Sequence, residues 1–176
     1  MELSAAIEMI NRMQFLKGDL SGERLPIRPP WALTETRFIA QCSRCGDCVQ
    51  ACADGLIQVG RGGFPQIDFS AGGCDFCRAC VEVCKPQALC LDTAANAAPW
   101  VLGVSILDSC LSLNGVVCRA CGEACEPRAI RFRPEVGGVA RPLLNREACT
   151  GCGACFAICP VKAVKILPVK PRDQAA

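Results

Sequence analysis

The spacing of the cysteines constrains this chain more than any other feature of its sequence. Seventeen of its 176 residues are cysteine, and it has no histidine. The absence of histidine excludes catalytic triads and zinc fingers that depend on that residue. Three segments share the spacing C-x2-C-x2-C-x3-C, and their cysteines are Cys42, Cys45, Cys48 and Cys52, then Cys74, Cys77, Cys80 and Cys84, then Cys149, Cys152, Cys155 and Cys159.

Disulfides, zinc sites and iron–sulfur clusters are the three uses that such a set of cysteines could have. Disulfides form in oxidising compartments, but residues 1–25 lack the apolar region and cleavage site of a secretory signal. An odd number of cysteines would also leave one thiol unpaired. Zinc sites usually combine two cysteine pairs separated by a longer loop. A third cysteine so soon after a pair instead suits a [4Fe–4S] cluster, which is wrapped by a tight loop. The spacing therefore favours [4Fe–4S] clusters.

A fourth group of cysteines is less regular. Cys118, Cys121 and Cys125 match the last three positions of the repeated spacing, whereas Cys110 precedes Cys118 by eight positions. We interpret this as the same motif with five inserted residues, about 111–115. The alternative is a decayed motif in which Cys110 is a buried thiol. We expect four clusters in all, or three if the irregular third motif is empty.

The segments between the motifs indicate a repeated α+β fold. A β-prone run follows each motif, at residues 56–59, 88–92, 129–133 and 163–167. After the first and third motifs, a glycine pair suited to a turn leads into a second extended run, at 64–69 and 139–145. We expect tandem bacterial ferredoxin-like modules, each with two [4Fe–4S] clusters, short hairpins and helices. The expected divisions are an N-terminal helix and proline-rich segment (1–36), module 1 (37–92), a joint (93–99), module 2 (100–168) and a tail (169–176).

The ligands of each cluster are expected to come from two motifs. In two-cluster ferredoxins the fourth cysteine of each run binds the other cluster, because a short helix carries it away from the first three. The predicted sets are Cys42, Cys45, Cys48 and Cys84; Cys74, Cys77, Cys80 and Cys52; Cys110, Cys118, Cys121 and Cys159; and Cys149, Cys152, Cys155 and Cys125. Cys90 remains, and we favour a small packed residue over a redox or ligand role.

Composition and motif content limit the classes of function. Nineteen Lys and Arg against 17 Asp and Glu give a net charge of +2, which does not indicate a nucleic-acid-binding surface. No run approaches the roughly 18 apolar residues that span a bilayer. A cluster with four cysteine ligands has no open iron for substrate, and neither a general base nor a glycine-rich nucleotide loop is evident. We therefore expect a protein that is not an enzyme, and that carries electrons or lends clusters to a partner.

Four sequence segments resemble one known family. IRPPWA (27–32), CSRCGDCVQAC (42–52), GRGGFPQIDF (60–69) and CDFCRACVEVC (74–84), together with the irregular third motif, are similar to NapF. NapF-type proteins are ferredoxin-type accessory proteins of bacterial periplasmic nitrate reductase systems, and the resemblance covers most of residues 4–165. It implies a cytoplasmic protein that binds the immature catalytic subunit and assists its maturation before export, by cluster insertion or reductive priming. The alternative function is a one-electron carrier that serves a reductase complex.

The N-terminal region raises a separate question of export and docking. Residues 11–17, NRMQFLK, are similar to a twin-arginine export motif, but Met13 replaces the second arginine and a polar stretch follows. We therefore do not expect export. Leu3, Ile7, Ile10 and Met13 have helical spacing, and we favour an amphipathic helix packed on its own domain over a partner-docking face. Residues 24–31 are expected to be extended and could cover the edge of a module.

Overall fold

The computed structural model describes residues 26–91 and 99–168, which form short helices and strands. The predicted N-terminal amphipathic helix and the export-like motif lie outside these residues. The elements of the first half are α2 (Glu35–Gln41), α3 (Asp47–Ala51), β1 (Ile57–Val59), the 3-10 turn η1 (Arg61–Gly63), β2 (Pro65–Ile67) and α4 (Ala79–Glu82). Those of the second half are β3 (Leu102–Ile106), the 3-10 turn η2 (Ser112–Asn114), α5 (Ala120–Glu123), β4 (Ile130–Pro134), β5 (Ala140–Leu144), α6 (Ala154–Ala157) and β6 (Val164–Pro168).

Two of the antiparallel strand pairs are the hairpins expected from the glycine pairs. β1 pairs with β2, and β4 pairs with β5. Gly62 and Gly63 have φ of 66° and 79°, and Gly137 and Gly138 have φ of 100° and 84°. Glycine adopts these angles without a Cβ clash, so the pairs set the positions of the turns. The predicted glycine turns are confirmed.

A third strand pair, β3 with β6, was only half predicted. The run 163–167 indicated β6, but nothing in the sequence analysis identified β3. Val104 lies opposite Ile166, and both side chains are buried. In the first half, the equivalent pairing is a single bridge between Ala32 and Leu89, so the expected extended run 88–92 does not form a strand over its described residues. The partner segment is too short for a strand, because two prolines precede it and Trp31 has a φ of 58°.

The proline-rich segment is built into the first half of the molecule. The Ile67 N–H donates to the Ile27 carbonyl at 2.7 Å. The Arg28 guanidinium pairs with Glu35 at 2.6 Å and lies 5.0 Å from the ring centre of Phe38, which is fully buried. The segment thus runs along β2, and the boundary expected between residues 36 and 37 falls within α2. The division into domains stays a prediction.

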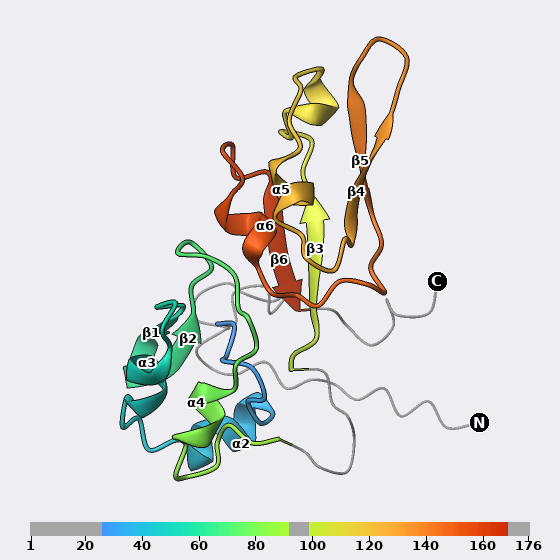
Figure 1. The fold of residues 1–176 in the computed structure, drawn as a ribbon. Coiled ribbons are helices and arrows are strands. Elements are labelled where there is room, and N and C mark those ends of the chain that lie inside the picture. The colour runs from blue at the N-terminus through green and yellow to red at the C-terminus, as the bar shows by residue number, and fades with distance from the viewer. Residues whose placement is uncertain (1–25, 92–98, 169–176) are drawn as a thin grey trace, which may run out of the picture.

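A repeated turn follows the fourth cysteine of every motif. Three positions after that cysteine, the backbone has a positive φ, and the N–H of the same residue donates to the cysteine carbonyl at 2.9–3.2 Å. The four residues are Gly55, Gln87, Arg128 and Lys162. This recurrence in both halves, with the helix pair α3 and α4 in the first and α5 and α6 in the second (Figure 1), makes the fold an α+β tandem of ferredoxin modules. Within the described ranges, none of the helices has the length and apolar character needed to cross a bilayer.

Candidate iron–sulfur sites

Left-handed backbone turns shape the loops that carry the first three cysteines. In each regular motif, the residues immediately before and after the second cysteine have φ between 60° and 89°. They are Arg44 and Gly46, Phe76 and Arg78, and Gly151 and Gly153. The helix that begins after this turn, α3, α4 or α6, ends just before the fourth cysteine. The turn therefore gathers three thiols, and the helix carries the fourth away.

The first set lines a hollow of about 330 Å³ between the two motifs of module 1. Cys42, Cys45 and Cys48 lie on one side, and Cys84 reaches the hollow from the end of α4. Burial, the largest cause, and the neighbouring Cys42, Cys84 and Cys45 together raise the pKa of the Cys48 thiol to about 11. A thiol with this pKa is protonated at neutral pH and must release its proton when iron binds.

The second set lines a hollow of about 530 Å³ at the end of α3 and the start of α4. Cys74, Cys77 and Cys80 share it with Cys52, which follows α3. Burial raises the pKa of Cys80 to about 12, with smaller contributions from neighbouring cysteines that include Cys74 and Cys52. The side chains of Cys45 in the first set and Cys77 in this one are exposed, whereas the other fourteen predicted ligands are buried or partly buried.

The third set forms despite the irregular spacing of its motif. Cys110, Cys118, Cys121 and Cys159 line a hollow of about 350 Å³. The inserted residues form η2 and a turn, in which the Ser112 hydroxyl donates to the Ala140 carbonyl at the start of β5. Burial, the largest cause, and the neighbouring Cys110, Cys118 and Cys159 together raise the pKa of Cys121 to about 11. The insertion therefore packs against the β4–β5 hairpin and returns the chain to the site.

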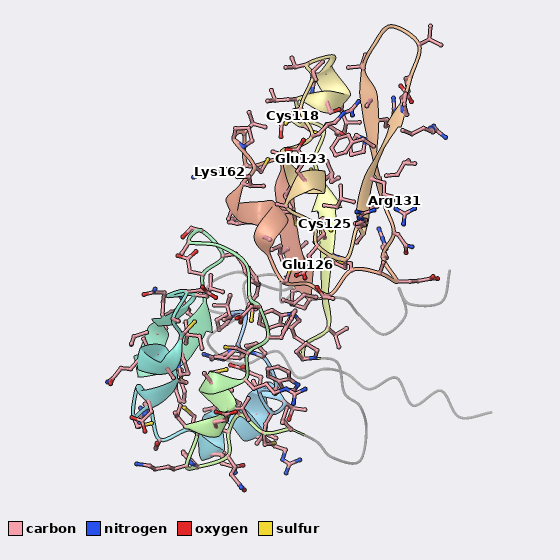
Figure 2. The ribbon with its side chains drawn as sticks, in the orientation of Figure 1. Cys118, Glu123, Cys125, Glu126, Arg131 and Lys162 are labelled. Atoms are coloured by element: carbon pink, nitrogen blue, oxygen red, sulfur yellow. The ribbon has the colours of Figure 1, made fainter. Side chains whose placement is uncertain are left out.

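The fourth set gathers around α5 and α6, which pack together. Burial is the largest cause that raises the pKa of Cys155 to about 12, and the neighbouring Cys152, Cys149, Cys121 and Cys125 contribute in that order. Burial also raises the pKa of Cys149, and Cys125 is again among the thiols that contribute. Cys118 precedes α5 and Cys125 follows it, so the two residues lie toward opposite ends of this helix (Figure 2).

The donor groups suit a [4Fe–4S] cluster. Four cysteine thiols surround a shared space, as such a cluster requires. Backbone N–H groups also point at the sulfurs: Leu89 donates to Cys84 Sγ at 3.3 Å, Ala163 to Cys159 Sγ at 3.2 Å, and Phe76 to Cys74 Sγ at 3.4 Å. Hydrogen bonds of this kind stabilise a charged cluster and adjust its potential.

Two observations concern the other uses that the sequence left open for the cysteines. All seventeen cysteines are free thiols. Within residues 26–91 and 99–168, no three Cys, Asp or Glu side chains lie close enough together to hold a single metal ion. The structure places three of the predicted groups of four around one hollow each and brings the thiols of the fourth group near one another, and ligation of iron stays a prediction. Cys90 is partly buried, and its N–H donates to the Trp31 carbonyl at 3.0 Å.

The sequence analysis missed the residues that surround the thiols. The N–H donors Leu89 and Ala163 follow the turns that come after the fourth cysteine, and the constant three-residue spacing to Gln87 and Lys162 could have located those turns. Phe38 and Leu89 line the first hollow, while Trp31 lines the second. Their positions depend on contacts between distant segments, for which the sequence has no signal.

Comparison with known proteins gives a consistent picture. The model for the 4Fe-4S dicluster domain matches residues 116–163. The ferredoxin-type protein NapF of Escherichia coli (strain K12) is 44% identical over 138 residues, which cover 78% of this chain and 82% of the relative. The ferredoxin-type protein NapF of Haemophilus influenzae is 38% identical over 177 residues, covering 95% and 99%. The ferredoxin-type protein NapG of Escherichia coli (strain K12) is 31% identical over 188 residues, covering 94% and 79%.

Proposed function

Because the chain belongs to the NapF family of ferredoxin-type proteins, we propose that it holds four [4Fe–4S] clusters and assists maturation of the periplasmic nitrate reductase catalytic subunit. It acts in the cytoplasm, on the immature subunit, before export. The observation that carries the proposal is the gathering of cysteines from two motifs around each of three hollows, with the fourth set grouped around α5 and α6.

The chemistry that the bound clusters supply is one-electron transfer, or donation of iron and sulfide to the partner. The chain's own part is to hold each cluster with four thiolates and to direct N–H groups at the sulfurs. Since four cysteines occupy each site, no open coordination position is left for a substrate. From this arrangement we propose that the protein does not itself catalyse a reaction.

Module 1 is better suited than module 2 to exchange with a partner. Cys45 and Cys77, the two exposed residues among the predicted ligands, each belong to a set in module 1. An incoming thiolate or chelator can reach a ligand there without unfolding the protein. This accessibility supports cluster insertion as the form of assistance, with module 1 as the donor.

The second candidate function is a one-electron carrier for a reductase complex. The paired helices of each module, α3 with α4 and α5 with α6, place two thiol sets side by side. Such proximity suits electron transfer, whether or not the clusters are ever donated. The two functions predict different defects in a strain without this protein. The reductase lacks iron if clusters are inserted, and it lacks only its supply of electrons if this protein is a carrier.

Co-purification under anaerobic conditions tests the leading proposal. The immature catalytic subunit should be recovered from the cytoplasmic fraction with the wild-type protein. It should be lost with the Cys45→Ala/Cys77→Ala variant and retained with Cys90→Ala, which changes a cysteine outside the four sets. Failure of the wild-type protein to bind the subunit would overturn the maturation role.

Metal analysis of the reductase separates the two candidates. Catalytic subunit purified from a strain without this protein should lack iron if clusters are inserted. A full metal complement, together with activity restored by an artificial electron donor, would exclude insertion and leave electron delivery.

A further inference from the structure

The cysteine loops of the two modules meet directly. The loop between β2 and α4 extends from the first module to α6 of the second (Figure 1). There the Cys74 N–H donates to the Cys152 carbonyl at 2.8 Å. Cys74 belongs to the second thiol set and Cys152 to the fourth. A single hydrogen bond thus links predicted ligand residues of different modules.

Two glycines allow the loops to approach this closely. A Cβ on Gly73 would lie 2.7 Å from both the Cβ and the backbone nitrogen of Ala154. A Cβ on Gly153 would overlap the ring of Phe69, a buried side chain of the first module. By contrast, a Cβ on Gly72 would meet no atom within 4 Å. The contact therefore depends on small residues at the points where the two modules touch.

Aromatic side chains surround the same contact. Trp100 lies 5.7 Å from Phe69 and 5.8 Å from Phe76 between ring centres, both in edge-on geometry. Its indole N–H donates to the Thr150 carbonyl at 3.1 Å, within the fourth motif. Trp100 thereby bridges the second and fourth cysteine loops. Phe76 and Thr150 are each the neighbour of a predicted ligand cysteine.

We infer that this junction positions the second and fourth sites as electronic neighbours, so that the four sites form one series rather than two separate pairs. The order is first, second, fourth and third. Trp100, Gly73 and Gly153 are its positioning residues. The inference rests on the proposed function in one respect, that the thiol sets hold [4Fe–4S] clusters.

The exchange across the junction is balanced within the molecule. One electron leaves the reduced centre on one side and reduces the oxidised centre on the other, and no proton or further reactant takes part. A continuous series lets an electron that enters at one end of the molecule leave at the other. Two separate pairs would confine it to the module that it entered.

Electron paramagnetic resonance on a two-site form of the full chain tests the inference. Cys42→Ala/Cys45→Ala and Cys118→Ala/Cys121→Ala together remove ligands from the first and third sets and leave the second and fourth. After anaerobic reconstitution and reduction with dithionite, we expect magnetic interaction between the remaining two sites. Adding Gly73→Ala should weaken this interaction, whereas Gly72→Ala, the same change at the adjacent open position, should preserve it.

Iron and sulfide analysis distinguishes the failure of this inference from that of the proposed function. Wild-type protein without iron would refute the cluster proposal itself. A two-site form that holds both clusters but shows no magnetic interaction would overturn only the inference. Magnetic interaction of equal strength in the Gly73→Ala and Gly72→Ala variants would show that neither Gly73 nor the close loop contact positions the two sites.

A second measurement applies if the two-site form does not fold. Hydrogen exchange at the Cys74 amide is measured in the reconstituted full chain, together with microwave power saturation of the reduced signal. Gly73→Ala should lose protection of this amide and saturate at lower power, and Gly72→Ala should match the wild type. An unprotected Cys74 amide in the wild type would overturn the inference.

Discussion

Arg28 illustrates how a single side chain ties the N-terminal segment to the first module. Its guanidinium pairs with Glu35, donates to the Pro65 carbonyl at 2.9 Å and lies near the rings of Phe38 and Phe64. Lysine has neither the planar shape nor the number of donors to make these contacts together. Arg28→Lys should therefore lower the free energy of unfolding by about 1–3 kcal/mol.

Denaturant unfolding of the reconstituted protein, followed by circular dichroism, measures the effect of Arg28→Lys. Arg61→Lys is the matched control, because Arg61 is exposed in the same module. Equal stability of the two variants would show that the Arg28 contacts do not hold the segment in place.

The cysteines of the irregular third motif provide a second prediction at the residue scale. Four [4Fe–4S] clusters amount to about sixteen irons per chain. Cys110→Ala/Cys121→Ala removes two of the four thiols of the third set and should lower the count to about twelve. Anaerobic iron and sulfide analysis measures this change.

Cys90→Ala is the control for the iron count, since Cys90 lies outside the four sets and should leave the count unchanged. About twelve irons in the wild type, with no decrease in Cys110→Ala/Cys121→Ala, would show that the third site is empty.

At the scale of elements, the insertion in the third motif acts as a structural support for the β4–β5 hairpin. The Ser112 hydroxyl, in η2, is buried and donates to the Ala140 carbonyl of β5. Ser112→Ala leaves this acceptor without its donor, and we expect a loss of about 1–3 kcal/mol of stability. The iron content should not change, because Ser112 is not a ligand.

Thermal unfolding and iron analysis of the reconstituted variants test the role of Ser112. Ser109→Ala changes an exposed serine close to the same insertion and should behave as the wild type. Loss of iron from Ser112→Ala would mean that the hydrogen bond holds the third thiol set rather than the hairpin.

At the scale of the whole molecule, the described elements are too short to be stable alone. Helices of 4 to 7 residues lie below the length at which isolated helices persist, and isolated two-stranded sheets are marginal. We therefore expect bound clusters to contribute directly to folding. Anaerobic removal of iron should abolish the secondary structure seen by circular dichroism, and added iron and sulfide should restore it. A metal-free chain with unchanged circular dichroism would contradict this prediction.

The two modules should also differ in how fast they lose iron. Cys45 and Cys77 are the exposed members of the module 1 sets, whereas the predicted ligands of module 2 are buried or partly buried. A chelator should therefore release iron from module 1 first. Mass spectrometry of alkylated thiols during anaerobic chelation locates the loss, with Cys152 and Cys155 expected to react late. Alkylation of Cys152 and Cys155 before the cysteines of module 1 would contradict this prediction.

The sequence by itself determined the local features of this protein. The close spacing of three cysteines forces them onto one loop, the short helix delivers the fourth thiol to a neighbouring set, and glycine pairs fix the hairpin turns. These features depend on residues a few positions apart, so spacing and residue type are sufficient to predict them. The same spacing allowed the third motif to be recognised despite its insertion.

Only the tertiary structure decided how distant segments meet. β3 pairs with a strand about sixty residues later, residues 26–33 complete the first module, and Gly73 and Trp100 join the second and fourth cysteine loops. Such contacts depend on complementary shape between surfaces whose residues lie far apart in the sequence. They produce no periodic pattern in the sequence, because the residue type at each of these positions depends on the residue that it contacts in space rather than on its neighbours in the chain.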